Sequence, residues 1–135
     1  MTRTRKTTSN YNPWDHAHRL DIPVIWGNPG CGHLGLWTGN QIILDAEMRS
    51  REVRCVLAHE IVHAEFEDHP TADHIWHARR EARCNRIAAA RLINPNRLLE
   101  LAATTEDMGI WALELGVTGW LLEAYLKANP HGLHR

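Results

Sequence analysis

Two histidines four residues apart, His59 and His63, enclose a glutamate in the pattern HExxH. Residues at this spacing lie on one face of an α-helix, so both imidazoles can bind one zinc ion. Glu60 follows the first histidine and can accept a proton from a water that attacks a carbonyl carbon. The motif predicts a zinc-dependent hydrolase in which Glu60 is the catalytic base. The alternative is a pair of histidines that merely decorate an amphipathic helix.

A hydrolytic zinc site keeps three protein ligands and one open position, so a third ligand must come from another element. We expect Glu81, near the start of the next predicted helix, to be this ligand. Asn85 lies one turn further on the same face and is expected to hydrogen-bond the far nitrogen of a ligand imidazole. The alternative for Glu81 is a solvated carboxylate that balances the neighbouring arginines, Arg79, Arg80 and Arg83.

Three histidines in the predicted connection, His69, His74 and His77, are rival third ligands. Position 66 is Phe, so the glycine that turns the chain toward a third histidine in some peptidases is missing. We expect His77 or His74 to face the cleft instead, as a hydrogen-bond donor to the oxyanion of the transition state. Cys55 and Cys84 flank the motifs and are expected to be buried thiols rather than metal ligands.

The surrounding pattern predicts an α+β fold. Residues 50–66 lack Gly and Pro and have helical periodicity, and a second helix is expected over residues 78–93. Extended runs at residues 22–26, 34–37 and 41–44 predict a small N-terminal antiparallel sheet packed on the HExxH helix. Asn-Pro pairs predict helix starts after Asn12 and Asn94. Further helices are expected over about residues 105–115 and 118–128.

Length and composition limit the possible functions. The chain has 135 residues and a net charge of −1, which argues against a nucleic-acid binder that relies on bulk positive charge. No apolar run is long enough to span a bilayer, and the basic N-terminus has no apolar segment behind it. Three cysteines make no disulfide framework, so we expect a cytoplasmic protein. The expected parts are a flexible basic tail (1–10), a zincin-like metallopeptidase core (11–95) and a C-terminal helical extension (96–135).

Three segments carry a family resemblance. Residues 57–64, LAHEIVHA, resemble the signature of the ImmA/IrrE family of zinc metallopeptidase-like proteins, and residues 81–89, EARCNRIAA, resemble its second motif. Residues 42–45, IILD, resemble the strand before the active-site helix of that family. The chain is most similar to the short actinobacterial and phage type. Cys84 and Ile87 replace a small residue and Phe, and Asn85 stands where Asp is often found. The resemblance implies a thermolysin-like, gluzincin-type site and intracellular proteolysis of a protein partner, often a helix-turn-helix repressor of a phage or mobile element.

Two functions compete with the peptidase. Residues 113–118 look like the turn of a helix-turn-helix, but the following helix is apolar and the last third of the chain is acidic, so no direct nucleic-acid binding is expected. The other alternative is a non-catalytic regulatory module that binds a protein and retains zinc for structure. The presence of Glu60, which is not needed to hold metal, favours the enzyme.

Overall fold

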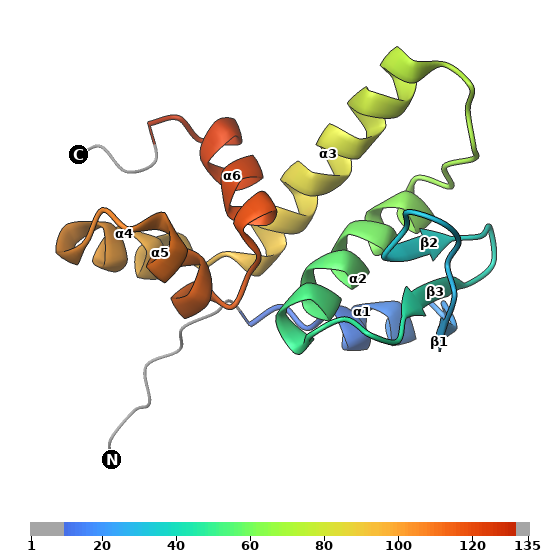
Figure 1. Ribbon diagram of the computed structural model, residues 1–135, viewed down its shortest axis with the longest axis horizontal. Helices are drawn as coiled ribbons and strands as arrows, with labels where there is room; N and C mark the ends of the chain where they lie inside the picture. The colour runs from blue at the N-terminus through green and yellow to red at the C-terminus, as the bar shows by residue number, and fades with distance from the viewer. Residues whose placement is uncertain (1–9, 132–135) are drawn as a thin grey trace.

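The computed structural model describes residues 10–131, so the predicted tail over residues 1–10 falls outside it except for Asn10. Over these residues the chain forms six helices and three strands. One helix and the three strands of a small sheet come first, and five helices follow (Figure 1). These elements are α1 (Pro13–Arg19), β1 (Val24–Gly27), β2 (Gly35–Trp37), β3 (Ile42–Asp45), α2 (Ser50–Glu65), α3 (His74–Leu92), α4 (Pro95–Thr104), α5 (Met108–Leu115) and α6 (Gly119–Ala128). The expected α+β class is confirmed.

The sheet is mixed, so the prediction of an antiparallel sheet was wrong in one strand pair. β2 and β3 form the expected antiparallel hairpin, in which Leu36 lies opposite Ile43. β1 pairs with the other edge of β3 and runs parallel to it, with Val24 opposite Ile42. The chain reverses direction once between β1 and β2 and again between β2 and β3. Two reversals give β3 the direction of β1, and the strand order becomes β1-β3-β2.

Helix α2 packs on one face of this sheet. Alternate residues of β3, Ile42 and Leu44, are fully buried against it. Leu57 and Ile61, one turn apart on α2, form the other side of this apolar cluster. The bounds of α2 agree with the helix predicted over residues 50–66. The packing fixes the position of the HExxH face relative to β2.

Helix α3 starts four residues earlier than predicted. The side chain of Asp73 accepts a hydrogen bond from the backbone N–H of Trp76 at 3.0 Å and caps the helix. Asp is a favoured N-cap because its carboxylate pairs a backbone donor that the helix leaves free. His74 and His77 therefore lie in the first turns of α3, and not in the connecting loop where they were expected.

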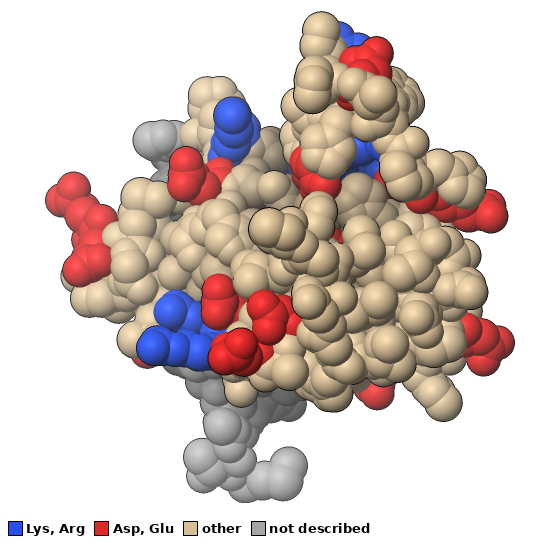
Figure 2. Space-filling model, turned by 45° about the vertical axis from the view of Figure 1, so that its right-hand side comes forward, with Lys and Arg blue, Asp and Glu red and all other residues tan. Residues whose placement is uncertain are grey.

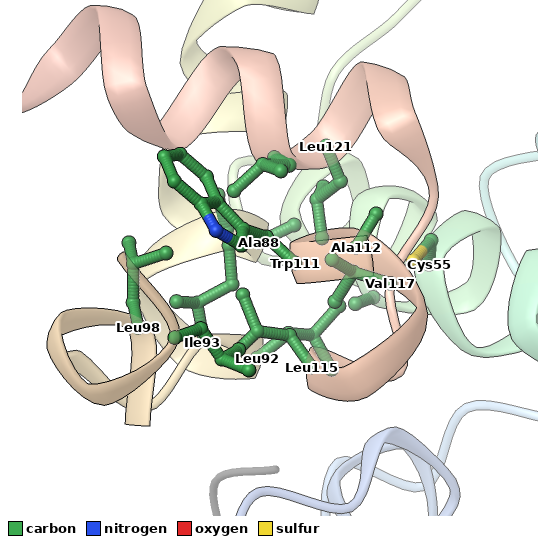
Figure 3. Packing of buried hydrophobic residues seen from close by; sticks show 14 residues of the cluster. Cys55, Ala88, Leu92, Ile93, Leu98, Trp111, Ala112, Leu115, Val117 and Leu121 are labelled. Atoms are coloured by element: carbon green, nitrogen blue, oxygen red, sulfur yellow. The ribbon is translucent and has the colours of Figure 1, made fainter. Parts of the chain in front are cut away.

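The helical half is held together by a second apolar cluster. Leu92, Leu115 and Leu121 are buried where α3, α5 and α6 meet, and Trp111 closes one side of the cluster (Figure 3). Asn94 caps α4, as predicted, by accepting hydrogen bonds from Asn96 N and Arg97 N. α5 ends at Gly116, whose φ of 71° lies in the left-handed region that favours glycine.

Helix α6 lies alongside the C-terminal half of α3 (Figure 1). The apolar face of α6, with Leu121 and Leu122, is buried against the rest of the cluster. On the face of the molecule in Figure 2, Lys and Arg side chains are few and stand next to Asp and Glu. Within residues 10–131, no helix combines the length and apolar character needed to cross a bilayer.

Candidate metal centre

Helices α2 and α3 bring the predicted ligands together. The Oε2 atom of Glu81 lies 2.6 Å from Nε2 of His59 and 3.4 Å from Nε2 of His63. The two imidazole rings are 4.9 Å apart between centroids, as expected for residues one helical turn apart. Glu81, from the neighbouring helix, therefore faces both imidazoles of the HExxH motif.

These donors fit a zinc ion. Imidazole nitrogen and carboxylate oxygen are zinc ligand types, and two ligands of one tetrahedral ion lie about 3.3 Å apart. The contact between Glu81 and His63 matches this separation, whereas Glu81 and His59 are closer and lie at hydrogen-bonding distance. Burial favours the neutral form of Glu81, but hydrogen bonds from His59 and His63 outweigh it and hold the pKa of this carboxyl far below its usual range. The carboxylate is thus ionised, as a ligand must be.

A hydrogen bond at the Nδ1 atom of each imidazole orients the ring. Nδ1 of His59 lies 2.7 Å from Oδ1 of Asn85, and Nδ1 of His63 lies 2.8 Å from Oδ2 of Asp68. Donation of Nδ1–H to these oxygens would leave Nε2, the atom that faces Glu81, as the nitrogen of each ring that binds an ion. Hydrogen bonds of this kind fix ring orientation and raise ligand basicity in metal sites.

Asp68 was missed by the sequence analysis. It lies just beyond the end of α2, and its carboxylate contacts the guanidinium groups of Arg83 and Arg80 as well as His63. Burial favours the neutral acid, but the hydrogen bonds from His63 and Arg83 lower the pKa of Asp68. The available signal was a carboxylate five residues after His63, close enough in sequence to fold back onto it.

Cys84 is buried, as expected, but it also belongs to the metal centre. Its sulfur and one nitrogen each of His59 and His63 all lie within 4.8 Å of one another, so these three residues form a group that could hold a metal ion. Its exposed fraction is 0%. Burial disfavours the charged form of His63, but hydrogen bonds to Cys84, Glu81 and Asp68 outweigh it and raise the pKa of His63 to about 11.

Glu60 points into the same centre from α2 and is only 8% exposed. Its Oε1 accepts a hydrogen bond from the backbone N–H of Trp37 on β2 at 3.0 Å. Burial raises the pKa of the Glu60 carboxyl, against the opposing effect of His59 and His63.

Close approach between α2 and β2 depends on Gly35. A Cβ atom at this position would lie 2.5 Å from Cγ1 of Val56 and 3.1 Å from Cγ of Glu60. The absence of a side chain therefore lets β2 reach Glu60. Gly35 could not be recognised from the sequence, because a glycine at the start of a strand carries no signal of what packs against it.

A cleft of about 280 Å³ opens between β2 and the start of α3. Glu60, His63 and Glu81 line it, together with His33, His69 and His77. His77 is 57% exposed, and its Nε2 lies 3.7 Å from Oε1 of Glu81. His74, the other expected oxyanion donor, is not among the residues that line this cleft.

The backbone of β2 forms one wall of the cleft. Leu34 O accepts from Asp45 N and Thr38 N donates to Gln41 O, so residues 34, 36 and 38 direct their backbone groups toward β3. The backbone groups of Gly35 and Trp37 therefore point away from β3. The N–H of Trp37 is donated to Glu60, so the Gly35 backbone and the Trp37 carbonyl are the groups of this edge with which an extended peptide can pair.

Residues 15–118 match the family model of the IrrE N-terminal-like domain, a peptidase family designated M78. No curated protein and no solved structure matches the chain significantly. The matched segment contains both helices of the metal centre and all three strands, and ends at the residue before α6. The chain belongs to the ImmA/IrrE family, and its core is a metallopeptidase-like domain.

Proposed function

We propose that this protein is a zinc-dependent endopeptidase that hydrolyses a peptide bond in a protein substrate. The observation that carries the proposal is the position of Glu60, a buried carboxylate beside His59 and His63 that is not needed to hold metal. Zinc, when bound by His59, His63 and Glu81, would polarise the scissile carbonyl and acidify the attacking water.

Each remaining group has a part in this reaction. Glu60 accepts the proton of the attacking water and passes it to the leaving amine, a role that its burial-raised pKa favours. The outward backbone groups of Gly35 and the carbonyl of Trp37 bind the substrate as an added strand, whereas the N–H of Trp37 holds Glu60 in place. His77, exposed at the cleft and next to Glu81, donates a hydrogen bond to the oxyanion. Asn85 and Asp68 keep the imidazoles oriented.

The substrate we propose is a cytoplasmic protein such as a helix-turn-helix repressor of a phage or mobile element. This part of the proposal rests on the family to which the chain belongs. The open cleft and the strand edge suit an extended segment of polypeptide, which a flexible linker in such a repressor would supply.

Cys84 favours a second candidate function. Together with His59, His63 and Glu81 it would complete four protein ligands, and a site closed in this way is structural rather than catalytic. The protein would then be a regulatory binding module that retains zinc for stability.

The test compares wild type, Glu60→Gln and an exposed control, Glu106→Gln, on a proteome-derived peptide library read by mass spectrometry. We expect about one zinc per chain in all three proteins, because Glu60 is not a ligand. Wild type and Glu106→Gln should cut the library, and Glu60→Gln should be slower by about 10²–10⁴-fold. Equal zinc content with no cutting by any of the three would favour the regulatory module.

A further inference from the structure

A second hollow lies on the other side of α3 from the catalytic cleft. It is a groove of about 440 Å³ between α3 and α6. Its lining residues are Ala82, Asn85, Arg86, Trp120, Glu123, Ala124, Lys127 and Ala128. None of these residues lines the catalytic cleft, and we call this hollow the α3–α6 groove.

The groove adjoins the metal centre through His59. The indole ring of Trp120 lies edge-on to the His59 ring, with 6.4 Å between centroids. Asn85 lines the groove and also contacts Nδ1 of His59. Glu81 lines the catalytic cleft, and its neighbour Ala82 lines the groove. His59 lines neither hollow, but it contacts Trp120 and Asn85 on the side of the groove and Glu81 on the side of the cleft.

The chemistry of the groove selects its occupant. Three alanines give it small, apolar walls, and the Trp120 indole, 38% exposed, offers a large apolar surface at the end nearest His59. The lining includes two basic residues, Arg86 and Lys127, and one acidic residue, Glu123, so the net charge of the groove is positive. Aromatic surfaces surrounded by polar groups bind large apolar side chains well. A net positive lining adds a preference for a neighbouring acidic residue.

We propose that the α3–α6 groove is a specificity subsite that takes a large apolar side chain of the substrate, next to an acidic residue, with Trp120 as the residue that determines the preference. This inference rests on the proposed peptidase function. The Trp120 ring lies edge-on against the ring of the metal ligand His59, so a side chain seated beside Trp120 lies next to the metal centre. We therefore expect the selected side chain close to the scissile bond in the substrate sequence.

The first experiment profiles cleavage of the peptide library by wild type, Trp120→Ala, Ala124→Leu and the control Trp26→Ala. Ala124→Leu fills the groove without removing Trp120, and Trp26 is an exposed indole on β1. Wild type and Trp26→Ala should select Leu, Met or Phe at one position beside the cut. Both groove variants should lose this selection. Selection that is absent in wild type, or unchanged in both groove variants, overturns the proposal.

The second experiment is a double-mutant cycle between enzyme and peptide. Replacing the selected apolar residue of the best library peptide by Ala should lower kcat/KM for wild type by about tenfold or more, mainly through KM. The same peptide change should have little effect on Trp120→Ala, because the contact is already lost. Additive effects of the two changes would show that Trp120 does not contact this residue.

A binding measurement separates this inference from the proposed function. Immobilised Glu60→Gln should retain apolar library peptides, and the double variant Glu60→Gln/Trp120→Ala should not. Trp120-dependent retention without any cutting by wild type would keep the groove as a peptide-binding site and overturn the peptidase. Cutting by wild type without Trp120-dependent selection or retention would keep the peptidase and overturn the groove.

Discussion

The two halves of the molecule are held together by different kinds of contact. Around the metal centre, partly buried charged and polar side chains face one another, as in the ion pairs of Glu81 with His59 and of Asp68 with His63. In the helical half, Leu92, Leu115 and Leu121 pack in a cluster of apolar residues. Directional contacts select protonation states and ring orientations, whereas apolar contacts mainly determine stability. Substitutions in the two halves should therefore affect different properties.

The largest expected effect on stability lies in the helical half. Leu121→Ala leaves a cavity among fully buried side chains and should lower the free energy of unfolding by about 2–5 kcal/mol. Zinc affinity of the folded protein should not change. The matched control is Leu113→Ala on α5, where the side chain is exposed and the loss should stay within about 0.5 kcal/mol. If urea denaturation gave the same loss of unfolding free energy for Leu121→Ala and Leu113→Ala, the packing described for α6 would be wrong.

The next effect is on metal binding. Glu81→Ala should weaken zinc binding by more than about 100-fold, the upper limit for residues that only support a ligand. Competition with a chromophoric chelator measures this affinity. His69→Ala and His77→Ala should retain the metal, since both residues line the cleft and His77 faces Oε1 of Glu81, the carboxylate oxygen that is not directed at the two imidazoles.

Measured in the same way, the zinc affinity of Cys84→Ser decides whether Glu81 or Cys84 is the third ligand. If zinc is held by His59, His63 and Glu81, this variant should retain it, because the thiol is only a neighbour of His63. Loss of zinc in Cys84→Ser but not in Glu81→Ala would make Cys84 the third ligand. The Co²⁺-substituted wild type would then show a sulfur-to-metal charge-transfer band that the Glu81 assignment does not produce.

The helix that carries His59 and His63, and the start of α4, were predictable because both depend on local sequence patterns. Helical periodicity and the spacing of His59 and His63 placed both imidazoles on one face of α2, and Asn94 and Pro95 correctly marked the start of α4. These signals act within one or two turns of the chain, so a single sequence contains them.

The missed features depend on contacts between distant segments. The parallel pairing of β1 with β3 follows from where the chain reverses, which composition does not encode. Gly35 matters only because Val56 and Glu60 pack against it. Trp120 belongs to a helix whose sequence shows only that it is apolar, and its contact with His59 arises from the docking of α6 on α3. Asp73 was overlooked as a cap because a polar run with Pro70 resembles a loop.

A smaller effect is expected one contact away from the metal ligands. Asp68→Asn keeps the size of the side chain but removes the charge that faces His63. Zinc affinity should fall by about 10–100-fold, the usual range for a residue that orients a ligand. Its exposed neighbour Glu67→Gln is the control and should bind zinc as wild type does. Unchanged affinity in Asp68→Asn would mean that Arg80 and Arg83 alone, and not His63, account for the position of this carboxylate.

The smallest effect concerns a histidine outside the metal centre. His16 on α1 contacts the hydroxyl of Tyr11 at 2.7 Å and Glu65 at 3.4 Å. Burial lowers the pKa of His16 from its ordinary value of 6.5, although Glu65 opposes the shift. A histidine with a lowered pKa binds fewer protons in the folded than in the unfolded protein between the two pKa values. The free energy of unfolding should therefore fall as the pH drops from about 7.5 through 6.5 toward the lowered pKa.

Urea denaturation of metal-free protein at a series of pH values isolates this contribution. His16→Gln removes the titrating group, so its stability should decline less steeply than that of wild type below about pH 7. His63 contributes with the opposite sign, because its pKa is raised to about 11 and its stabilisation is complete below pH 6.5 and lost only as the pH rises through the raised value. Glu81 and Asp68 have lowered pKa values, so their stabilisation is lost only as the pH falls through their ordinary values of 4.5 and 3.8 and below. The decline between about pH 7.5 and about pH 5.5 is thus assigned to His16. His18→Gln, an exposed change on the same helix, should keep the wild-type slope. A wild-type slope in His16→Gln would show that burial does not determine the protonation of His16.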